Sequence, residues 1–107
     1  MSFFELRQYT ATAGNRKALV KIMEEEVIPF QTAAGMVILA SFVSEEDEDT
    51  YIWVRRFKTE AERAKLYKKV YESAAWKEDI GPRIMPLIDR TGINVKRILA
   101  TPRSPMQ

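Results

Sequence analysis

The chain has 107 residues, enough for one domain that buries roughly 60 to 70% of its unfolded surface, and its 46% hydrophobic and 30% charged residues are typical of a globular protein. It contains no cysteine and no histidine, which excludes disulfides, thiolate nucleophiles, histidine metal ligands and the usual proton shuttle at neutral pH. The net charge is +2, but Lys and Arg are spread along the whole chain, so the composition does not indicate a nucleic-acid-binding surface.

The first half of the chain predicts a strand, a helix and a second strand. Residues 3–10 alternate between apolar and polar side chains, as in a strand with one buried face. Gly14 then precedes a segment of helical periodicity, in which Pro29 is expected to kink or end the helix and Gly35 to close the connection. Residues 36–44 are almost continuously apolar, which favours a strand that is buried on both faces.

The second half predicts a strand, a helix and a last strand. The acidic residues 45–49 break the apolar run, and residues 51–57 alternate again, which indicates a hairpin. Thr59 and Glu62 fit a capping box at the start of the second helix. Residues 93–99 then predict the last strand.

A short apolar segment follows the second helix. Ser73 is a candidate cap for this segment, which contains Trp76 and is expected to stop at Gly81-Pro82. Trp76 is more typical of a core residue than of a ligand platform. Tyr67 and Tyr71, one helical turn apart, are also expected in the core, although they could line a cleft between helices and sheet.

The order strand, helix, strand, strand, helix, strand predicts an α+β fold. Its usual compact form is the ferredoxin-like βαββαβ arrangement, with one four-stranded antiparallel sheet and both helices on one face. Residues 1–100 are expected to form this domain, and residues 101–107, which include two prolines, a loose tail.

The second face of the predicted sheet carries aromatic and charged side chains. We expect Leu6, Ile52 and Val54 to face the helices, because side chains alternate along a strand and these are aliphatic. A large aromatic patch on a soluble protein usually marks an interface or a ligand site. The residues expected on this second face are Glu5, Arg7, Tyr9, Tyr51, Trp53 and Arg55.

Two interpretations of these residues remain open. In the first, they form the interface of a homodimer, and ion pairs between Glu5 and the arginines hold the strands in register. In the second, they line a polar pocket, in which Arg7 and Arg55 would bind a carboxylate or phosphate and Glu5 could accept a proton.

Searches for functional motifs return nothing specific. The sequence has no P-loop, dinucleotide fingerprint, zinc or calcium spacing, or nucleophile elbow, so no cofactor or metal is expected and no catalytic residue is singled out. The start of the sequence lacks the basic segment of a signal peptide, and no apolar run reaches the roughly 18 residues of a membrane span. A cytoplasmic protein that does not bind membranes is therefore expected.

The order and spacing of several short motifs resemble the NIPSNAP family, over nearly the full length of the chain. The matching pieces are Glu5-Leu6-Arg7, Tyr9-Thr10, Gly14, Ile28-Pro29, Gly35, Trp53-Val54-Arg55-Arg56-Phe57, Ala61-Glu62-Arg63 and Trp76. The resemblance implies a dimeric α/β barrel, in which two ferredoxin-like subunits pack sheet against sheet. The residues of interest that it carries over are Glu5, Arg7, Tyr9, Trp53, Arg55 and Trp76.

The activity that this resemblance implies is open. Related dimeric barrels include cofactor-free monooxygenases and haem-degrading enzymes, and the haem enzymes rely on histidine, which this chain lacks. The leading hypothesis is a homodimer that encloses a small-molecule site or acts as an interaction module. The alternative is a cofactor-independent monooxygenase or isomerase acting on a small aromatic or acidic metabolite. RNA binding, as in recognition domains of the same topology, is disfavoured by the acidic residues 45–49.

Overall fold

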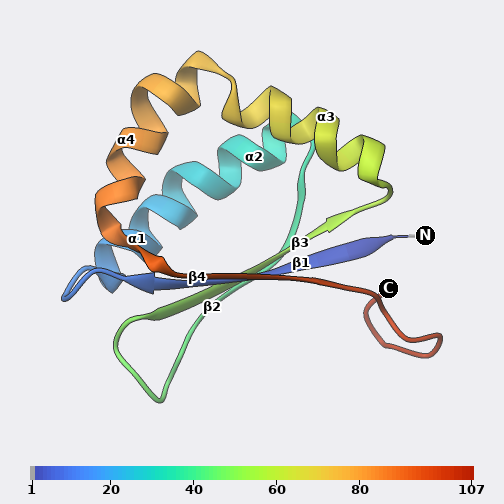
Figure 1. Ribbon diagram of the computed structural model, residues 1–107, viewed down its shortest axis with the longest axis horizontal. Helices are drawn as coiled ribbons and strands as arrows, with labels where there is room; N and C mark the ends of the chain where they lie inside the picture. Colours follow the sequence, from blue (N-terminus) through green and yellow to red (C-terminus); the bar gives the residue numbers. More distant parts are fainter. Residues whose placement is uncertain (1) are drawn as a thin grey trace.

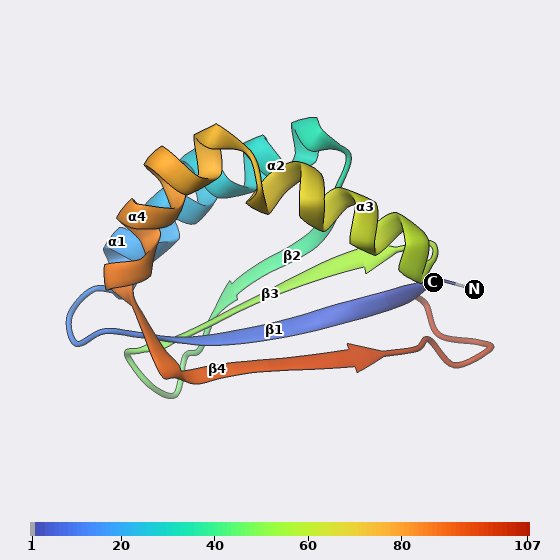
Figure 2. The same ribbon diagram turned by 45° about the horizontal axis from the view of Figure 1, so that its top comes forward.

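The computed structural model describes residues 2–107 and has one four-stranded sheet with its helices on one face (Figures 1 and 2). All neighbouring strands are antiparallel. The prediction of a ferredoxin-like α+β fold is therefore confirmed. The strands, in their order across the sheet, are β2 (Val37–Val43), β3 (Thr50–Phe57), β1 (Phe3–Ala11) and β4 (Ile88–Ile98).

Three helical segments cover the sheet. The first joins α1 (Arg16–Ile22), the π-helical turn η1 (Met23–Val27) and α2 (Ile28–Ala34). The second is α3 (Glu60–Tyr71), whose predicted cap is present, since Thr59 Oγ1 accepts the Glu62 amide at 3.1 Å. The third joins the π-helical turn η2 (Trp76–Ile80), α4 (Gly81–Ile84) and the 3₁₀ turn η3 (Met85–Leu87).

Proline ends neither of the two interrupted helices, so the stop predicted at Gly81-Pro82 was wrong, and so was the ending that Pro29 was given as an alternative to a kink. The chain stays helical for five residues beyond Pro29, until Gly35 at φ 114° closes α2. It likewise continues through Pro82. In each case a π turn directly precedes the proline-containing helix, as when the Ile28 amide bonds back to the Met23 carbonyl. The wider turn gives room to the proline ring and needs no amide from it.

The two faces of the sheet are exchanged relative to the prediction. Tyr51, Trp53 and Arg55 are each at most 1% exposed and lie beneath the helices. The aliphatic residues Ile52 and Val54 point the opposite way. Aliphatic character predicts the helix-covered face, whereas here the aromatic rings and paired charges are covered and the aliphatic side chains are not.

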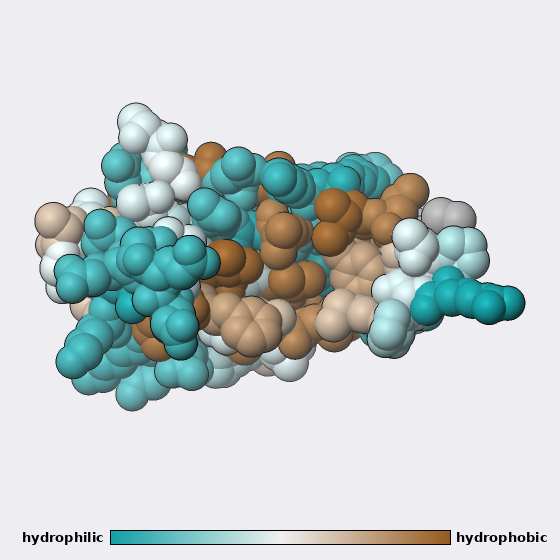
Figure 3. Space-filling model, turned by 90° about the horizontal axis from the view of Figure 1, so that it is seen from below, coloured by the Kyte–Doolittle hydropathy of each residue, from teal (hydrophilic) through white to brown (hydrophobic). Residues whose placement is uncertain are grey.

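The face turned away from the helices carries a cluster of aliphatic and aromatic side chains that we call the outer patch. Figure 3 shows hydrophobic residues gathered across the middle of this face. Phe42 is 62% exposed, and an exposed apolar surface of this kind is typical of an interaction site. The strand registers place in the outer patch Leu6, Val37, Ala40, Phe42, Ile52 and Val54.

The last strand begins five residues earlier than predicted, at Ile88. An irregularity interrupts its pairing with β1, since Gln8 pairs with Asn94 whereas Thr10 pairs with Asp89. Gly92 lies in this bulge, where a Cβ atom would come within 2.4 Å of the Thr10 hydroxyl. After Ile98 the chain has no helix or strand, and it turns back so that the Gln107 carbonyl accepts a bond from Arg56 at 2.9 Å.

Within residues 2–107, no helix combines the length and the apolar character needed to cross a membrane.

Candidate functional site

A cavity of about 290 Å³ lies between the sheet and the helices. This volume is near the lower end of the ~300–1,000 Å³ typical of small-molecule sites. Aromatic rings and one guanidinium group line it on several sides, and aliphatic and methionine side chains fill the remainder. The lining residues are Arg7, Tyr9, Met23, Val27, Trp53, Tyr67, Tyr71, Trp76, Ile84, Met85, Ile88 and Ile93.

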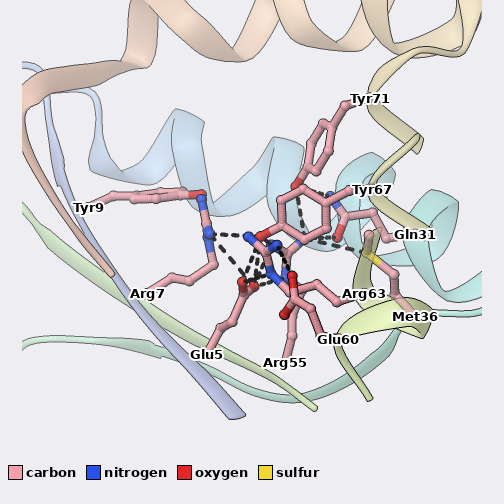
Figure 4. A network of polar contacts seen from close by, with 10 residues as sticks. All are labelled: Glu5, Arg7, Tyr9, Gln31, Met36, Arg55, Glu60, Arg63, Tyr67 and Tyr71. Carbon is pink, nitrogen blue, oxygen red and sulfur yellow. Dashed lines mark hydrogen bonds and ion pairs between the residues drawn. The ribbon is translucent and has the colours of Figure 1, made fainter. Parts of the chain in front are cut away.

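Beside the cavity, Glu5 is the centre of a group of polar side chains that we call the arginine network (Figure 4). Its carboxylate accepts bonds from Arg55 Nη2 at 2.7 Å, from Arg63 Nε at 2.9 Å and from the Tyr67 hydroxyl at 2.7 Å. Burial alone would raise the pKa of Glu5, but these donors outweigh burial and hold it below its usual value. Glu5 is therefore an anchored anion and a poor proton acceptor. The network comprises Glu5, Arg7, Gln31, Arg55, Arg63, Tyr67 and Tyr71.

Arg55 is fully buried, and its guanidinium N–H donors form hydrogen bonds within the chain. Besides the two bonds to Glu5, its Nη1 donates to Gln31 Oε1 at 2.9 Å and to the Tyr71 hydroxyl at 2.8 Å. The guanidinium also lies 4.7 Å from the ring of Trp53, within the range of a cation–π contact. Arg55 thus ties the sheet to α2 and α3 and has little capacity left for a ligand.

Arg7 is the guanidinium that borders the cavity. Its Nε donates to the Tyr9 hydroxyl at 3.1 Å and its Nη1 to the Tyr67 hydroxyl at 3.2 Å, and both partners are neutral. The nearest carboxylate oxygen, on Glu5, is 3.7 Å away. Burial works to lower the pKa of Arg7, but the surrounding tyrosines raise it overall, so the group stays charged.

Trp53 stands directly opposite Arg7 across β1 and β3, and it lines the same cavity. Its side chain is almost fully buried, yet its indole Nε1 has no hydrogen-bond partner among residues 2–107. Buried indole donors usually find a partner, because leaving one unmade costs about 1–3 kcal/mol. Trp53 therefore carries one unused donor, which is buried beside the cavity.

Edge-to-face aromatic pairs form two sides of the cavity. Tyr71 packs against Tyr67 and Trp76 with ring centroids 5.1 and 4.9 Å apart, and Tyr9 packs against Trp53 at 6.1 Å. Burial raises the pKa of Tyr67 to about 12, although the charges of Arg55 and Arg7 oppose this. Tyr67 is therefore protonated at neutral pH, where it donates a hydrogen bond to Glu5 and would be a poor base.

The structure brings most of the sequence-predicted site residues together, on the covered side of the sheet. Arg7, Tyr9, Trp53 and Trp76 line the cavity, whereas Glu5 and Arg55 lie in the arginine network beside it. The five residues on β1 and β3 lie beneath the helices and Trp76 lies in η2, so none of the six belongs to the outer face through which two sheets could pack.

Tyr51 stands apart from this group and does not line the cavity. It is buried in the core, and its hydroxyl is 2.7 Å from the Ser41 hydroxyl on β2.

The sequence reasoning missed Gln31 and Arg63. Gln31 is fully buried and follows Val27 by four residues, so a polar residue on the apolar stripe of the first helix was the available signal. Arg63 precedes Tyr67 by four residues on α3 and thus shares its face. Tyr67 and Tyr71 line the cavity between helices and sheet, in agreement with the cleft position that the sequence allowed for them.

Within residues 2–107, no three acidic side chains lie close enough together to hold a metal ion. The side chains around the cavity favour anions over cations, since the one buried carboxylate is already paired with arginine. The arrangement provides hydrogen-bond donors, aromatic surfaces and positive charge.

Solved structures share this fold over the full chain. A NIPSNAP family protein from Agrobacterium tumefaciens superposes with a TM-score of 0.89 at 23% identity, covering 100% of both chains. A second NIPSNAP family protein from that organism, of unknown function, has a TM-score of 0.89 at 23% identity, covering 99% of this chain and 94% of the other.

A proposed antibiotic biosynthesis monooxygenase from Chloroflexus aurantiacus is less similar, with a TM-score of 0.62 at 17% identity over 94% of each chain. No protein-family model matches the sequence, and no match was found among curated proteins. The resemblance noted in the sequence is thus confirmed at the level of the fold, and the chain has the ferredoxin-like fold of NIPSNAP family proteins.

Proposed function

We propose that this chain is a NIPSNAP-like small-molecule-binding protein that works as a homodimer. The observation that carries the proposal is the aromatic-lined cavity of about 290 Å³ between sheet and helices. Side chains in protein interiors normally close such a space, because voids forfeit contacts. Here the aromatic pairs and the arginine network hold it open, as expected of a preformed binding site.

The dimer part of the proposal rests on the outer patch. Phe42 and Val37 are 62% and 38% exposed on a sheet face that the helices leave uncovered. A second copy packed sheet against sheet would remove these apolar side chains from water, at roughly 25 cal/mol per Å². It would also leave both cavities intact, because they lie on the opposite side of each sheet.

A cofactor-independent monooxygenase or isomerase is the second candidate. The likeness to the proposed monooxygenase from Chloroflexus aurantiacus favours it. The cavity could hold a small aromatic substrate. However, proton abstraction would need a base, and the carboxylate of Glu5 is held by Arg55, Arg63 and Tyr67 with a lowered pKa. The geometry therefore supports binding better than acid–base catalysis.

Tryptophan fluorescence tests the binding function directly. Both tryptophans of the chain, Trp53 and Trp76, line the cavity, so emission reports on its contents. A set of single-ring compounds of positive, neutral and negative charge should contain members that change the emission and raise the melting temperature.

Filling the cavity provides the matched control. Val27→Phe adds a ring at a lining position and should abolish these responses, whereas Val43→Phe, the same substitution at an exposed site on β2, should leave them unchanged. Circular dichroism checks that both variants fold. If no compound of any charge gives a response, or if Val27→Phe responds like the parent protein, the proposed binding function is wrong.

A further inference from the structure

The charge beside the cavity is not balanced. Arg55 is paired with Glu5 at 2.7 Å, and Arg63, which also bonds Glu5, has a second carboxylate partner in Glu60 at 3.3 Å. Arg7 donates no hydrogen bond to a carboxylate, because its bonded partners are the hydroxyls of Tyr9 and Tyr67, and the Glu5 oxygen 3.7 Å from its Nη1 is the one that already bonds Arg55. The cavity wall therefore carries about one positive charge in excess.

A buried charge without a partner is unfavourable. The side chain of Arg7 is only 16% exposed, and taking a guanidinium out of water costs several kcal/mol unless an anion or several hydrogen bonds compensate. Its Nη2 donates to none of residues 2–107 and is not among the buried atoms, so it is open to water or to a ligand. One further group with negative charge would complete the set of partners of Arg7.

Trp53 supplies an independent indication of the same kind of partner. Its indole Nε1 is a donor only, it is buried, and it lacks an acceptor. Trp53 is the cross-strand neighbour of Arg7, and the Arg7 guanidinium carbon lies 5.7 Å from the Trp53 ring centroid. Two neighbouring residues of the cavity lining thus each have a donor without a partner among residues 2–107: Trp53 Nε1, which is buried, and Arg7 Nη2, which is open to a ligand.

The parts of the cavity lining beyond Arg7 are mainly apolar. Tyr71, Trp76, Val27 and Ile84 form them, and the total volume suits a body of about one ring. A flat apolar group would lie among the aromatic side chains, in offset or edge-to-face contact. The cavity therefore combines one charged group with a largely apolar and aromatic lining.

On the basis of the proposed binding function, we propose that the ligand is a small monoanionic oxygen acid. An aromatic carboxylate or phenolate has the required form. Its charged oxygen accepts hydrogen bonds from the Arg7 guanidinium and the Trp53 indole N–H, and its ring lies against Tyr71 and Trp76. Glu5 and Arg55 make no contact with the ligand and hold Arg7, Tyr67 and the strands in place.

Benzoate and benzamide test this proposal, since the two have nearly the same shape and differ in charge. Titrations followed by tryptophan emission and by calorimetry should show benzoate binding at least roughly tenfold more tightly, as expected for hydrogen bonds to a charged group. Arg7→Met should remove this preference, and Arg7→Lys, which keeps the charge, should retain part of it. Trp53→Phe, read through Trp76, should weaken benzoate binding about three- to tenfold.

Arg103→Met is the matched control, because Arg103 is exposed in the tail and its loss changes the net charge equally. This variant should bind benzoate like the parent protein. If benzamide binds as tightly as benzoate, or if the folded Arg7→Met variant keeps the preference, the monoanion proposal is wrong while the binding function stands. If neither these two probes nor the compounds of the wider screen bind, the proposed function falls as well.

Discussion

The two faces of this sheet reverse the usual distribution of polar and apolar side chains. The face beneath the helices contains Glu5 and Arg55, both at most 2% exposed, whereas the outer face exposes Phe42 and its aliphatic neighbours. Charges can be buried on the helix side because α2 and α3 bring partners to them, namely Gln31, Tyr67 and Tyr71. The difference teaches that the buried charges of Glu5 and Arg55 find their partners within the chain, whereas the apolar side chains of the outer face lie uncovered.

Removing the central charge of the covered face, the Glu5 carboxylate, should have the largest effect on the free energy of unfolding. In Glu5→Gln, Arg55 loses a carboxylate that no other described residue replaces, and the cost of stranding a buried charge is roughly 3–5 kcal/mol. We expect urea unfolding to show a loss of this size in the free energy of unfolding.

Glu60→Gln is the matched control for Glu5→Gln. Glu60 also pairs with Arg63, but its side chain is 57% exposed, so we expect a loss of about 1 kcal/mol or less. Equal losses in the two variants would mean that the arginine network does not stabilise the covered face more than a surface ion pair does.

Neighbouring residues on β2 allow a matched test of the outer face. Phe42 pairs with Ile52 on the outer side, and Val43 pairs with Tyr51 on the helix side, although both are exposed at the edge strand. Phe42→Glu would place one charge from each copy in the proposed dimer interface and should raise the dimer dissociation constant on the order of 100-fold. Val43→Glu adds the same charge and should leave the dissociation constant nearly unchanged. Sedimentation velocity over a concentration series measures both, and a parent protein that stays monomeric at high micromolar concentration would refute the dimer.

The fold was predictable from the sequence, whereas the orientation of the sheet was not. The alternation of residues 51–57 fixes which residues share a face, and the structure confirms that Tyr51, Trp53 and Arg55 do. Alternation alone does not say which of the two faces meets the helices. Gln31 on the first helix, and Arg63 with Tyr67 and Tyr71 on the second, contained that information, since a helix with polar and tyrosine side chains on its buried face requires a charged partner.

The helix ends were unpredictable for a different reason. Pro29 and Pro82 normally indicate a helix end, because proline lacks an amide and crowds the preceding turn. In this chain a π turn comes before each proline. No feature of the residues Met23–Val27 or Trp76–Ile80 predicts a π turn. The second of these turns also brings Trp76 to the cavity, where a Cβ on Gly81 would come within 3.1 Å of its Nε1.

The pH dependence of stability is expected to give the smallest effect, but it tests the contribution of the Glu5 carboxylate selectively. The pKa of Glu5 is lowered in the folded protein from an ordinary value of 4.5, because Arg55, Arg63 and Tyr67 outweigh its burial. A depressed folded pKa means that the carboxylate stabilises the protein fully above about pH 4.5 and loses this contribution as the pH falls through the folded pKa.

The difference in unfolding free energy between the parent protein and Glu5→Gln should therefore be constant from neutral pH down to about pH 5 and shrink below pH 4.5. Other carboxyl groups titrate in both proteins, so their contributions cancel in this difference. Urea unfolding at half-unit pH steps measures it. A difference that stays constant down to pH 3 would show that the Glu5 carboxylate does not stabilise the folded protein through its charge. Packing alone would then distinguish the covered face from the outer face.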